Sequence, residues 1–382
     1  MDRPLNVLYV VIGLNLGGVQ QWVLDLCKRL DPKRFRPLVC AIENTGIIGK
    51  EIEALGVEVV TLGYRRQSFR TIKALASLMK ERQIDILHGV SYHPSLYARL
   101  AGLMAGTPVM LTYEPVVYDN RRIQRVLLSR FLDRYTDGYV ACSQGVVQQL
   151  DAWYGYSKDK VALIYNAVDT EQFKPPVSRA DAKKKLGFDP ERPVVGMVAR
   201  LDPEKGHRFF FEAIKRLQGY ADVQWLVVGS GRAEAEVKEQ AKQFGVADRV
   251  QFLGTRRDLP DLLGAFDIYV LPTLKEGFPI TTLNAMACGC AVVVSDYPAN
   301  LEAVKNDING LVVPMGDSVQ LAQAMDRLLA SEAQRSTLGD AARRDVLEHF
   351  SIERHITLME AYYQRMWDAK QKNAGGEKGI RR

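Results

Sequence analysis

Apolar residues along this chain gather into short runs that alternate with stretches of helical spacing. In the first part of the chain the runs occupy 6–12, 38–42, 57–62, 84–88, 109–112, 138–142 and 161–165. Such short, near-continuous runs are typical of strands buried on both faces of a sheet. Residues 19–30 instead repeat apolar side chains every three or four positions, which predicts a helix packed by one face, and 69–82 is also expected to be helical. The pattern predicts a parallel α/β domain.

The same alternation restarts after a polar stretch. Residues 170–190 contain two adjacent prolines and three adjacent lysines, which indicates a linker. Beyond it, strand-length runs occupy 194–199, 223–228, 250–253, 268–272 and 291–294, and helices are expected at 207–217, 319–329 and 352–367. The sequence therefore predicts two Rossmann-like domains, at 1–169 and 191–350, and a polar tail at 370–382.

Composition and charge narrow the class of protein. The chain is 47% apolar and 25% charged, which is ordinary for a globular protein with a sizeable core. Its formal net charge of +6 suits anionic ligands and is too weak to indicate nucleic acid. No apolar run reaches membrane-spanning length, and the first residues lack the pattern of a signal peptide, so a cytoplasmic location is expected.

Cysteine usage favours reduced, structural residues. The five cysteines are odd in number, and four of them lie in or beside apolar runs. Cys288 and Cys290 have the spacing of a metal-binding pair, but no second pair of Cys or His at ligand spacing accompanies them. We therefore expect no metal site.

Glu276 and Gly277 follow the run 268–272, at the carboxyl end of a predicted strand. Open α/β sheets bind their ligands at this edge. Pro279 suits the first position of the following helix, because that position leaves its N–H unpaired and proline has none. The free N–H groups of residues 280–282 would then form a site for an anion such as phosphate. A plain strand-to-helix connection with a solvated Glu276 is the alternative.

Two cations occupy the equivalent place after the run 194–199. Arg200 ends this strand, and Lys205 follows five residues later, just before the helix 207–217. Arginine offers phosphate a planar fork and lysine offers a point charge. The pair therefore suits a diphosphate.

A glycine-rich turn follows the first strand. Gly17 and Gly18 lie between the run 6–12 and the helix 19–30, where glycine lets the backbone approach a ligand closely. The spacing differs from G-x-G-x-x-G, so a dinucleotide site is only weakly indicated. A tight turn without ligand contact is the alternative.

Three further polar residues end or follow neighbouring strands of the first domain. His88 ends the run 84–88, His93 lies five residues further on, and Glu114 follows the run 109–112. Residues at these strand ends share one sheet edge, where histidine could orient an acceptor or a leaving oxygen. A structural role is the alternative for each histidine.

Residues 119–135 combine arginines with apolar side chains. Arg121, Arg122 and Arg125 group on one side of the expected helix, while Arg130 and Arg134 fall among the apolar positions. This composition suits contact with an anionic membrane surface. A core helix with one solvated face is the alternative.

Several of these segments occur in an order typical of one family. They are the glycine pair 17–18, Ser143, and residues 164–169, 198–201, 203–206, 228–231, 250–254 and 276–279. The ordered set resembles the large family of retaining, nucleotide-sugar-dependent glycosyltransferases called group 1 or family four. The resemblance covers about residues 5–367, nearly the whole chain.

The resemblance implies the GT-B fold, in which two Rossmann-like α/β/α domains face each other across a cleft. Residues 1–169 would form the acceptor domain and 191–350 the donor domain, with the helix 352–367 crossing back to the first. A nucleotide diphosphate sugar would be the co-substrate, and the resemblance implies no metal or other cofactor.

The resemblance also assigns roles to single residues. Arg200 and Lys205 would hold the donor diphosphate and stabilise the departing nucleotide, and Glu276 would lie beside the donor sugar. Gly17 and Gly18 would approach the phosphates when the cleft closes. The other donor-side positions are Gly254, Gly277, Phe278, Pro279, Ile280, Thr281 and Asn284.

Two positions depart from the family pattern. Asn284 stands where the second acid of the Glu-x7-Glu motif usually holds the ribose, and an amide carries no charge. Glu114 stands near the place where many relatives carry a histidine. Ribose affinity, base choice and acceptor chemistry therefore do not carry over from the family.

The resemblance implies transfer of a sugar from a UDP- or GDP-linked donor to a hydroxyl of a saccharide or lipid-linked acceptor, with retention of configuration. Such an enzyme would serve cell-surface polysaccharide or glycolipid assembly at the inner membrane face. The leaving phosphate would help to deprotonate the acceptor, without a covalent nucleophile. Two alternatives stay open: an impaired homologue that only binds nucleotide sugar, favoured by Asn284, and a sugar-nucleotide epimerase of the same fold.

Overall fold

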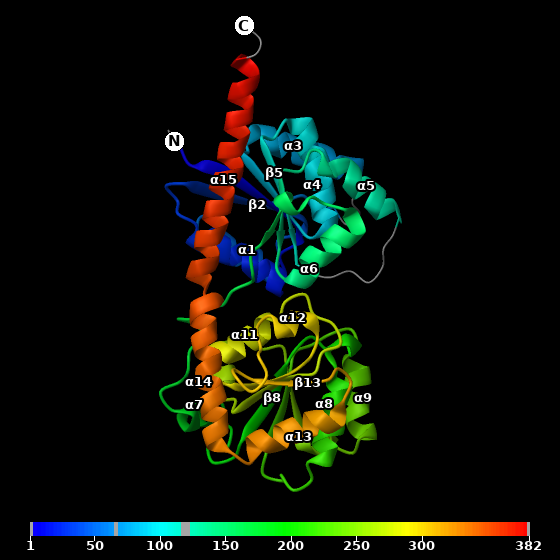
Figure 1. Ribbon diagram of the computed structural model, residues 1–382, viewed down its shortest axis with the longest axis vertical. Helices are drawn as coiled ribbons and strands as arrows, with labels where there is room; N and C mark the ends of the chain where they lie inside the picture. Colours follow the sequence, from blue (N-terminus) through cyan, green and yellow to red (C-terminus); the bar gives the residue numbers. More distant parts are fainter. Residues whose placement is uncertain (1–2, 65–67, 116–122, 380–382) are drawn as a thin grey trace. The chain divides into compact units, whose positions relative to one another are not determined.

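The computed structural model describes residues 3–64, 68–115 and 123–379, which form two α/β units (Figure 1). Unit 1 comprises Met1–Asn166 and Glu353–Arg382, and unit 2 comprises Ala167–Ile352. Each unit is built around its own parallel sheet, as the two sets of apolar runs predict.

Unit 1 contains a seven-stranded sheet in the order β3-β2-β1-β4-β5-β6-β7. Its strands are β1 (Leu5–Gly13), β2 (Phe35–Asn44), β3 (Val59–Thr61), β4 (Ile86–Val90), β5 (Val109–Glu114), β6 (Gly138–Ala141) and β7 (Val161–Leu163). Its helices are α1 (Gly18–Arg29), α2 (Gly46–Ala54), α3 (Phe69–Glu81), α4 (Tyr92–Ala105), α5 (Ile123–Asp133), α6 (Gln144–Gln149) and α15 (Ile352–Gly379).

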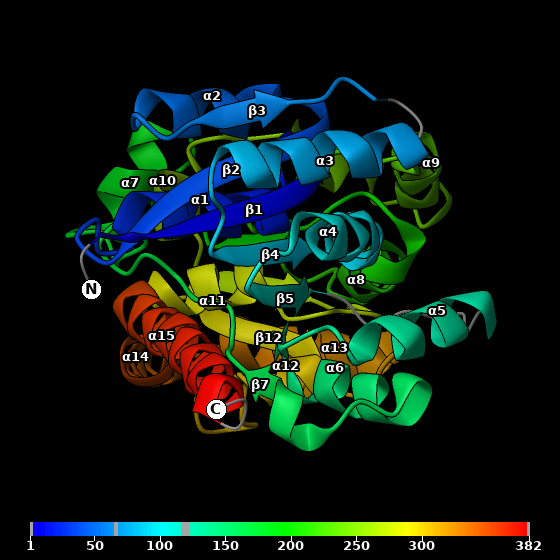
Figure 2. The same ribbon diagram turned by 90° about the horizontal axis from the view of Figure 1, so that it is seen from above.

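Alternation along the strands divides the core of unit 1 between the two faces of its sheet. Leu8 of β1 is buried in one cluster with Leu75 of α3 and Ala101 of α4, two helices that lie side by side (Figure 2). Tyr9 points to the opposite face, where its ring lies against Trp22 of α1 with centroids 6.2 Å apart. Helices therefore cover both faces, as parallel sheets require.

Buried polar contacts anchor α15 to unit 1. The Tyr363 hydroxyl lies 3.0 Å from that of Tyr9 and 2.7 Å from Nδ1 of His88. Earlier on the same helix, the Trp22 indole N–H donates to Nε2 of His355 at 2.8 Å. The proton of His355 therefore lies on Nδ1, which donates to a backbone carbonyl at 2.7 Å. These pairings hold the imidazole of His355 neutral.

Unit 2 contains a six-stranded sheet in the order β10-β9-β8-β11-β12-β13. Its strands are β8 (Val194–Val198), β9 (Gln224–Val228), β10 (Val250–Gly254), β11 (Ile268–Leu271), β12 (Ala291–Ser295) and β13 (Leu311–Val313). Its helices are α7 (Arg179–Lys185), α8 (His207–Arg216), α9 (Glu234–Gln243), α10 (Leu259–Gly264), α11 (Ile280–Ala287), α12 (Pro298–Leu301), α13 (Ser318–Leu329) and α14 (Glu332–His349). The order reverses beside the first strand, which is the doubly wound arrangement that places ligands at the carboxyl edge.

The stretch expected to be a linker, 170–190, differs from that expectation, because it includes α7 and belongs to unit 2. Lys183 is only 5% exposed, and its ammonium lies 2.8 Å from a carboxylate oxygen of Asp267. The same oxygen accepts the N–H of Val194 at the start of β8. A buried lysine satisfied in this way ties the polar stretch to the sheet.

Helix α15 continues through most of the expected polar tail, because it is helical as far as Gly379. Lys370 lies within it and pairs with Asp137 of unit 1 at 2.8 Å. In the described part of the chain, no helix combines the length and apolarity needed to cross a bilayer.

Stability should decline as the pH falls below about 6.5, because unit 1 buries neutral histidines. Burial lowers the pKa of His88 to about 3 and that of His355 to about 4, from 6.5. Below pH 6.5 the two histidines take up protons in the unfolded chain but not in the folded unit, which favours unfolding. Their neutral burial therefore lowers the free energy of unfolding only below about pH 6.5, and not above it. The shift at His355 corresponds to about 3 kcal/mol. Urea denaturation followed by circular dichroism, at neutral pH and at about pH 5, measures the decline.

The variant His355→Gln keeps an acceptor for the Trp22 indole and removes the titrating ring. It should be less stable at neutral pH and should decline less steeply with acid. A decline as steep as in the unchanged chain would contradict the role given to His355.

Candidate active site

Two loops at the carboxyl edge of the unit 2 sheet lie side by side, because they follow neighbouring strands. One follows β8 and contains a short 3₁₀ turn, Pro203–Lys205, and the other follows β11. Glu204 links them, since its carbonyl accepts the Leu274 N–H at 2.7 Å and the Thr273 hydroxyl at 3.0 Å. The candidate residues from two distant parts of the sequence are thereby brought together.

Lys205 and Glu276 form an ion pair between these loops. The Lys205 ammonium lies 2.9 Å from Oε2 of Glu276 and 3.2 Å from the Lys275 carbonyl. Their side chains are 13% and 18% exposed, so solvent and ligand still reach them. The ammonium has three N–H donors, and these two contacts leave one for an anionic ligand. Oε1 of Glu276 accepts the N–H of Gly277 at 3.1 Å, which fixes the carboxylate.

Gly206 permits the close approach of the two loops. Its φ of 79° is left-handed, and a Cβ at this position would lie 1.9 Å from the Pro272 carbonyl oxygen. Any larger residue would push the 3₁₀ turn away from the β11 loop. Lys205 therefore meets Glu276 only because glycine follows it.

Arg200 is positioned by two carboxylates and faces solvent. Its Nε contacts Asp202, its Nη2 lies 3.0 Å from Glu204, and its side chain is 61% exposed. The guanidinium therefore stands at the sheet edge with a restrained orientation. Asp202 itself is only 3% exposed, and sequence reasoning had not singled it out.

The start of α11 differs from the expected arrangement. Pro279 precedes the helix with φ −83° and ψ 71°, and the Ile280 N–H donates back to the Phe278 carbonyl at 2.9 Å. These angles define an inverse γ-turn. The expectation that Pro279 opens the helix and that the Ile280 N–H is free was therefore wrong. Among described residues, no backbone carbonyl accepts from Thr281 or Thr282. Thr282 is fully buried and Thr281 is partly exposed, so only the Thr281 N–H is accessible to an anion.

The other donor-side positions differ in exposure and hydrogen bonding. Phe278 is 4% exposed with its ring 5.7 Å from that of Phe350, so only its backbone can serve a ligand. The Thr281 hydroxyl accepts from Tyr269 at 2.9 Å. Asn284 is 8% exposed within α11.

The remaining glycine candidates lie at the carboxyl edges of both sheets. Gly254 ends β10 with a left-handed φ of 63°, and its carbonyl accepts the Gly229 N–H at 2.8 Å. Gly17 and Gly18 belong to unit 1, where Gly17 precedes α1 and Gly18 begins it.

The three acceptor-side candidates of unit 1 differ in burial and in their contacts. His88 is fully buried and bonded to Tyr363, so it is a structural histidine, which corrects its assignment to the acceptor side. His93 is exposed in the first turn of α4, with its ring 5.2 Å from that of Tyr92. Glu114 ends β5 and is 7% exposed.

Comparison with known families decides the class of protein. The model for group 1 glycosyl transferases matches residues 178–345, and the model for glycosyltransferase family 4 matches residues 16–172. The lipopolysaccharide core biosynthesis mannosyltransferase LpsB of Rhizobium meliloti is 30% identical over 62% of this chain and 68% of its own length. The chain belongs to the group 1, family 4 glycosyltransferases. The resemblance drawn from the ordered motifs is thereby confirmed.

Two further similarities cover almost all of this glycosyltransferase. An Escherichia coli UDP-Gal:alpha-D-GlcNAc-diphosphoundecaprenol alpha-1,3-galactosyltransferase is 26% identical over 94% of this chain and 96% of its own. The structure of Anabaena Alr3699/HepE with UDP and glucose superposes with a TM-score of 0.83, at 20% identity, over 94% of this chain and 100% of the other. Together with the two parallel sheets, this likeness confirms the GT-B fold.

The cysteine pair of the glycosyltransferase is part of its core. Cys288 and Cys290 are fully buried, and burial raises the pKa of Cys290 to about 12. Within the described ranges, no group of three or more His, Cys, Asp or Glu side chains is arranged to hold a metal ion.

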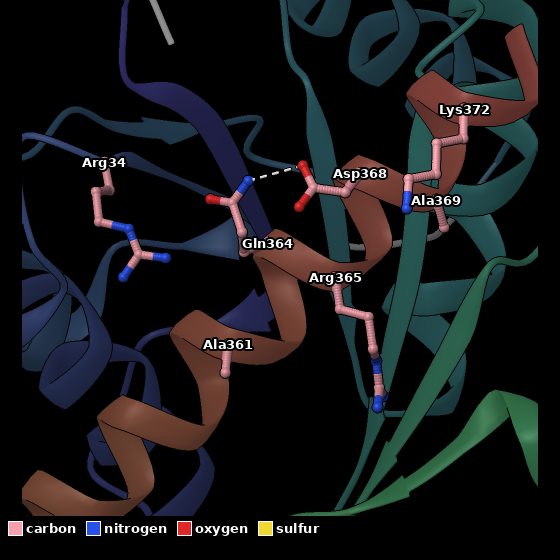
Figure 3. A pocket seen from close by; sticks show the side chains of 7 residues that line it. All are labelled: Arg34, Ala361, Gln364, Arg365, Asp368, Ala369 and Lys372. Carbon is pink, nitrogen blue, oxygen red and sulfur yellow. Dashed lines mark hydrogen bonds between the residues drawn. The ribbon is translucent and has the colours of Figure 1, made fainter. Parts of the chain in front are cut away.

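A separate open pocket of the enzyme lies along α15 in unit 1 (Figure 3). Its lining residues are Arg34, Ala361, Gln364, Arg365, Asp368, Ala369 and Lys372. Arg34 immediately precedes β2, so the pocket lies at the amino edge of the sheet, opposite the strand ends that carry Glu114. Figure 3 shows Gln364 bonded to Asp368, at 2.9 Å, with Arg34 and Arg365 on opposite sides of α15 in this view. We therefore place the candidate site in unit 2 and not in this pocket.

Replacing Gly206 should damage both stability and nucleotide binding. Gly187 provides a matched control, because it has φ 78° and a Cβ there would meet nothing within 4 Å. Gly187→Ala should lower the free energy of unfolding by only about 1–2 kcal/mol, the strain of a left-handed backbone at alanine. Gly206→Ala should cost more, and should lose thermal stabilisation by UDP or GDP, because Lys205 is displaced. Equal losses in the two variants would show that the approach to Pro272 is unimportant.

Proposed function

We propose that this glycosyltransferase moves a sugar from a UDP- or GDP-linked donor to an acceptor hydroxyl, with retention of configuration. The observation that carries the proposal is the Lys205–Glu276 ion pair at the carboxyl edge of unit 2, with a spare N–H donor on Lys205. Arg200 lies on the same loop as Lys205, and the N–H group of the partly exposed Thr281 lies in the first turn of α11 without a backbone partner among the described residues. Together these groups suit a nucleotide diphosphate.

The same groups explain how the donor bond would break. As the bond between the anomeric carbon and the phosphate oxygen breaks, negative charge develops on the diphosphate, where Arg200 and Lys205 stabilise it. These cations supply charge that a divalent ion would otherwise supply, so we propose a reaction that needs no metal. The acceptor hydroxyl attacks the same face, and its proton passes to the leaving phosphate oxygen. Glu276 then serves to orient Lys205 and the donor sugar.

The comparisons support a lipid-linked or saccharide acceptor. The Escherichia coli relative acts, by its name, on a sugar carried by diphosphoundecaprenol, and the Rhizobium relative serves lipopolysaccharide core biosynthesis. We propose that this enzyme likewise serves glycolipid or polysaccharide assembly. Proton NMR of the product from an α-linked donor gives the anomeric configuration, and a β-linked product would overturn retention.

Arg200→Ala should lower kcat by about 100-fold or more while leaving the fold intact, because a main stabiliser of the leaving group is lost. Arg327→Ala is the matched control, since Arg327 is 49% exposed on α13 and pairs with Asp307 at 2.6 Å. Sugar transfer and circular dichroism are measured on both. Turnover like that of the unchanged enzyme in Arg200→Ala would remove Arg200 from the mechanism. Full binding of nucleotide sugar by the unchanged chain without any transfer would favour the impaired homologue.

Helix α5 presents an exposed apolar row that supports a membrane-facing surface in unit 1. Ile123, Leu127 and Phe131 are 69%, 62% and 47% exposed, and their spacing of four places them on one side. Val126 and Leu132, on the other side, are 3% and 0% exposed. Helix α5 therefore packs one side against unit 1 and exposes apolar side chains on the other.

Arginines accompany this apolar row. The Arg134 guanidinium lies 5.3 Å from the centre of the Phe131 ring, and Arg130 donates to the Tyr154 carbonyl at 3.0 Å. Arg121 and Arg122, which belong to the same basic stretch, lie outside the described residues. We propose that the row and its arginines rest on an anionic membrane surface, where a lipid-linked acceptor would be presented.

Leu127→Glu should weaken binding to phosphatidylglycerol vesicles about tenfold, because it places a carboxylate in the apolar row. Phe69→Glu serves as the control, since Phe69 is 62% exposed on α3, outside the row. Co-sedimentation with anionic and with neutral vesicles measures both. Equal vesicle binding by the two variants would exclude α5 as the contact surface.

A further inference from the structure

Asp202 holds two guanidiniums at the candidate donor site. Its carboxylate is 3% exposed and contacts Nε of Arg200 through one oxygen and Nε of Arg232, at 2.6 Å, through the other. A buried carboxylate shared by two arginines fixes both of them at their inner nitrogens. Their terminal amino groups are left on the outer side.

Backbone packing between two loops makes this arrangement. The loop after β9 lies against the loop after β8, where the Leu201 N–H donates to the Ser230 carbonyl at 3.0 Å. The Ala233 N–H donates in return to the Leu201 carbonyl at 3.1 Å. A Cβ on Gly231 would lie 2.3 Å from that same carbonyl oxygen. The close contact of Gly231 with the Leu201 carbonyl therefore fixes the backbone that positions Arg232 beside Asp202.

Arg232 is the more available of the two arginines. Arg200 gives one terminal amino group to Glu204 at 3.0 Å. Arg232 is 80% exposed, and in the described part of the structure Asp202 is its sole hydrogen-bond partner. Both of its terminal amino groups therefore remain for a ligand.

We propose that Arg232 binds the phosphate groups of the donor nucleotide, as a second guanidinium beside Arg200. This inference rests on the proposed function. The planar fork of arginine suits phosphate oxygens, and the anchor at Asp202 orients it before the ligand arrives. Strand β9 lies on the opposite side of β8 from β11, so Arg232 stands across Arg200 from the Lys205–Glu276 pair. Arg232 therefore serves donor affinity and not the departure of the leaving group.

Calorimetric titration of the full chain with UDP, GDP and the matching nucleosides tests this assignment. Arg232→Ala should raise the Kd for the nucleoside diphosphate that binds about tenfold, because it loses charge-assisted hydrogen bonds, and should leave nucleoside binding unchanged. The Kd of Arg232→Lys for the diphosphate should lie between those of the unchanged chain and Arg232→Ala, because lysine keeps the charge but lacks the planar fork of arginine. Arg327→Ala should match the unchanged chain. In transfer assays, Arg232→Ala should raise KM for the donor with kcat within about twofold of the unchanged enzyme.

Four outcomes would overturn the assignment. Unchanged diphosphate affinity in Arg232→Ala would make the contact with Asp202 a plain surface ion pair. An equal loss for the nucleoside would move Arg232 to the base or ribose. A fall in kcat as large as that of Arg200→Ala would make it part of the leaving-group machinery. If the unchanged chain binds neither UDP nor GDP, the proposed function fails and this inference fails with it.

Discussion

Close backbone packing between loops is the constraint on which the candidate site depends. Gly206 allows the β8 loop to meet the Pro272 carbonyl, and Gly231 allows the β9 loop to meet the Leu201 carbonyl. Neither approach leaves room for a Cβ, so each fixes a loop to within a narrow range of positions. The first contact brings Lys205 to Glu276, and the second brings Arg232 to Asp202. Charged side chains are thereby oriented by rigid backbone, which is the condition for electrostatic stabilisation without reorganisation.

Buried polar groups have different roles in the two units. In unit 1 the hydroxyl of Tyr363 and the imidazole of His355 attach α15 to the core, and they are shielded from any ligand. In unit 2 the carboxylates of Asp202 and Glu276 lie at the sheet edge, where they orient cations that remain partly exposed. The first set contributes to stability and makes it pH-dependent, while the second set prepares a site for an anion.

Much of the architecture could be predicted from the sequence, because buried parallel strands leave short apolar runs and a doubly wound sheet joins neighbouring strand ends. The placement of Arg200, Lys205 and Glu276 at one edge of the unit 2 sheet follows from that logic and from the family motifs. Other features depend on tertiary contacts that no local pattern records. Lys183 lies in a polar stretch but is buried against Asp267, and His88 ends a strand but is bonded inside the core. The partnership of Arg232 with Asp202 required knowledge of how two loops pack.

We propose that unit 2 carries a nucleotide diphosphate site in which protein cations bind the phosphates. Thermal stabilisation of the purified chain by UDP, GDP and ADP and their common sugars, with and without EDTA, tests it most directly. A marked stabilisation by one nucleotide family, unchanged by EDTA, is the predicted result. Stabilisation by none of them, or only in the presence of a divalent ion, would contradict a metal-free nucleotide diphosphate site in unit 2.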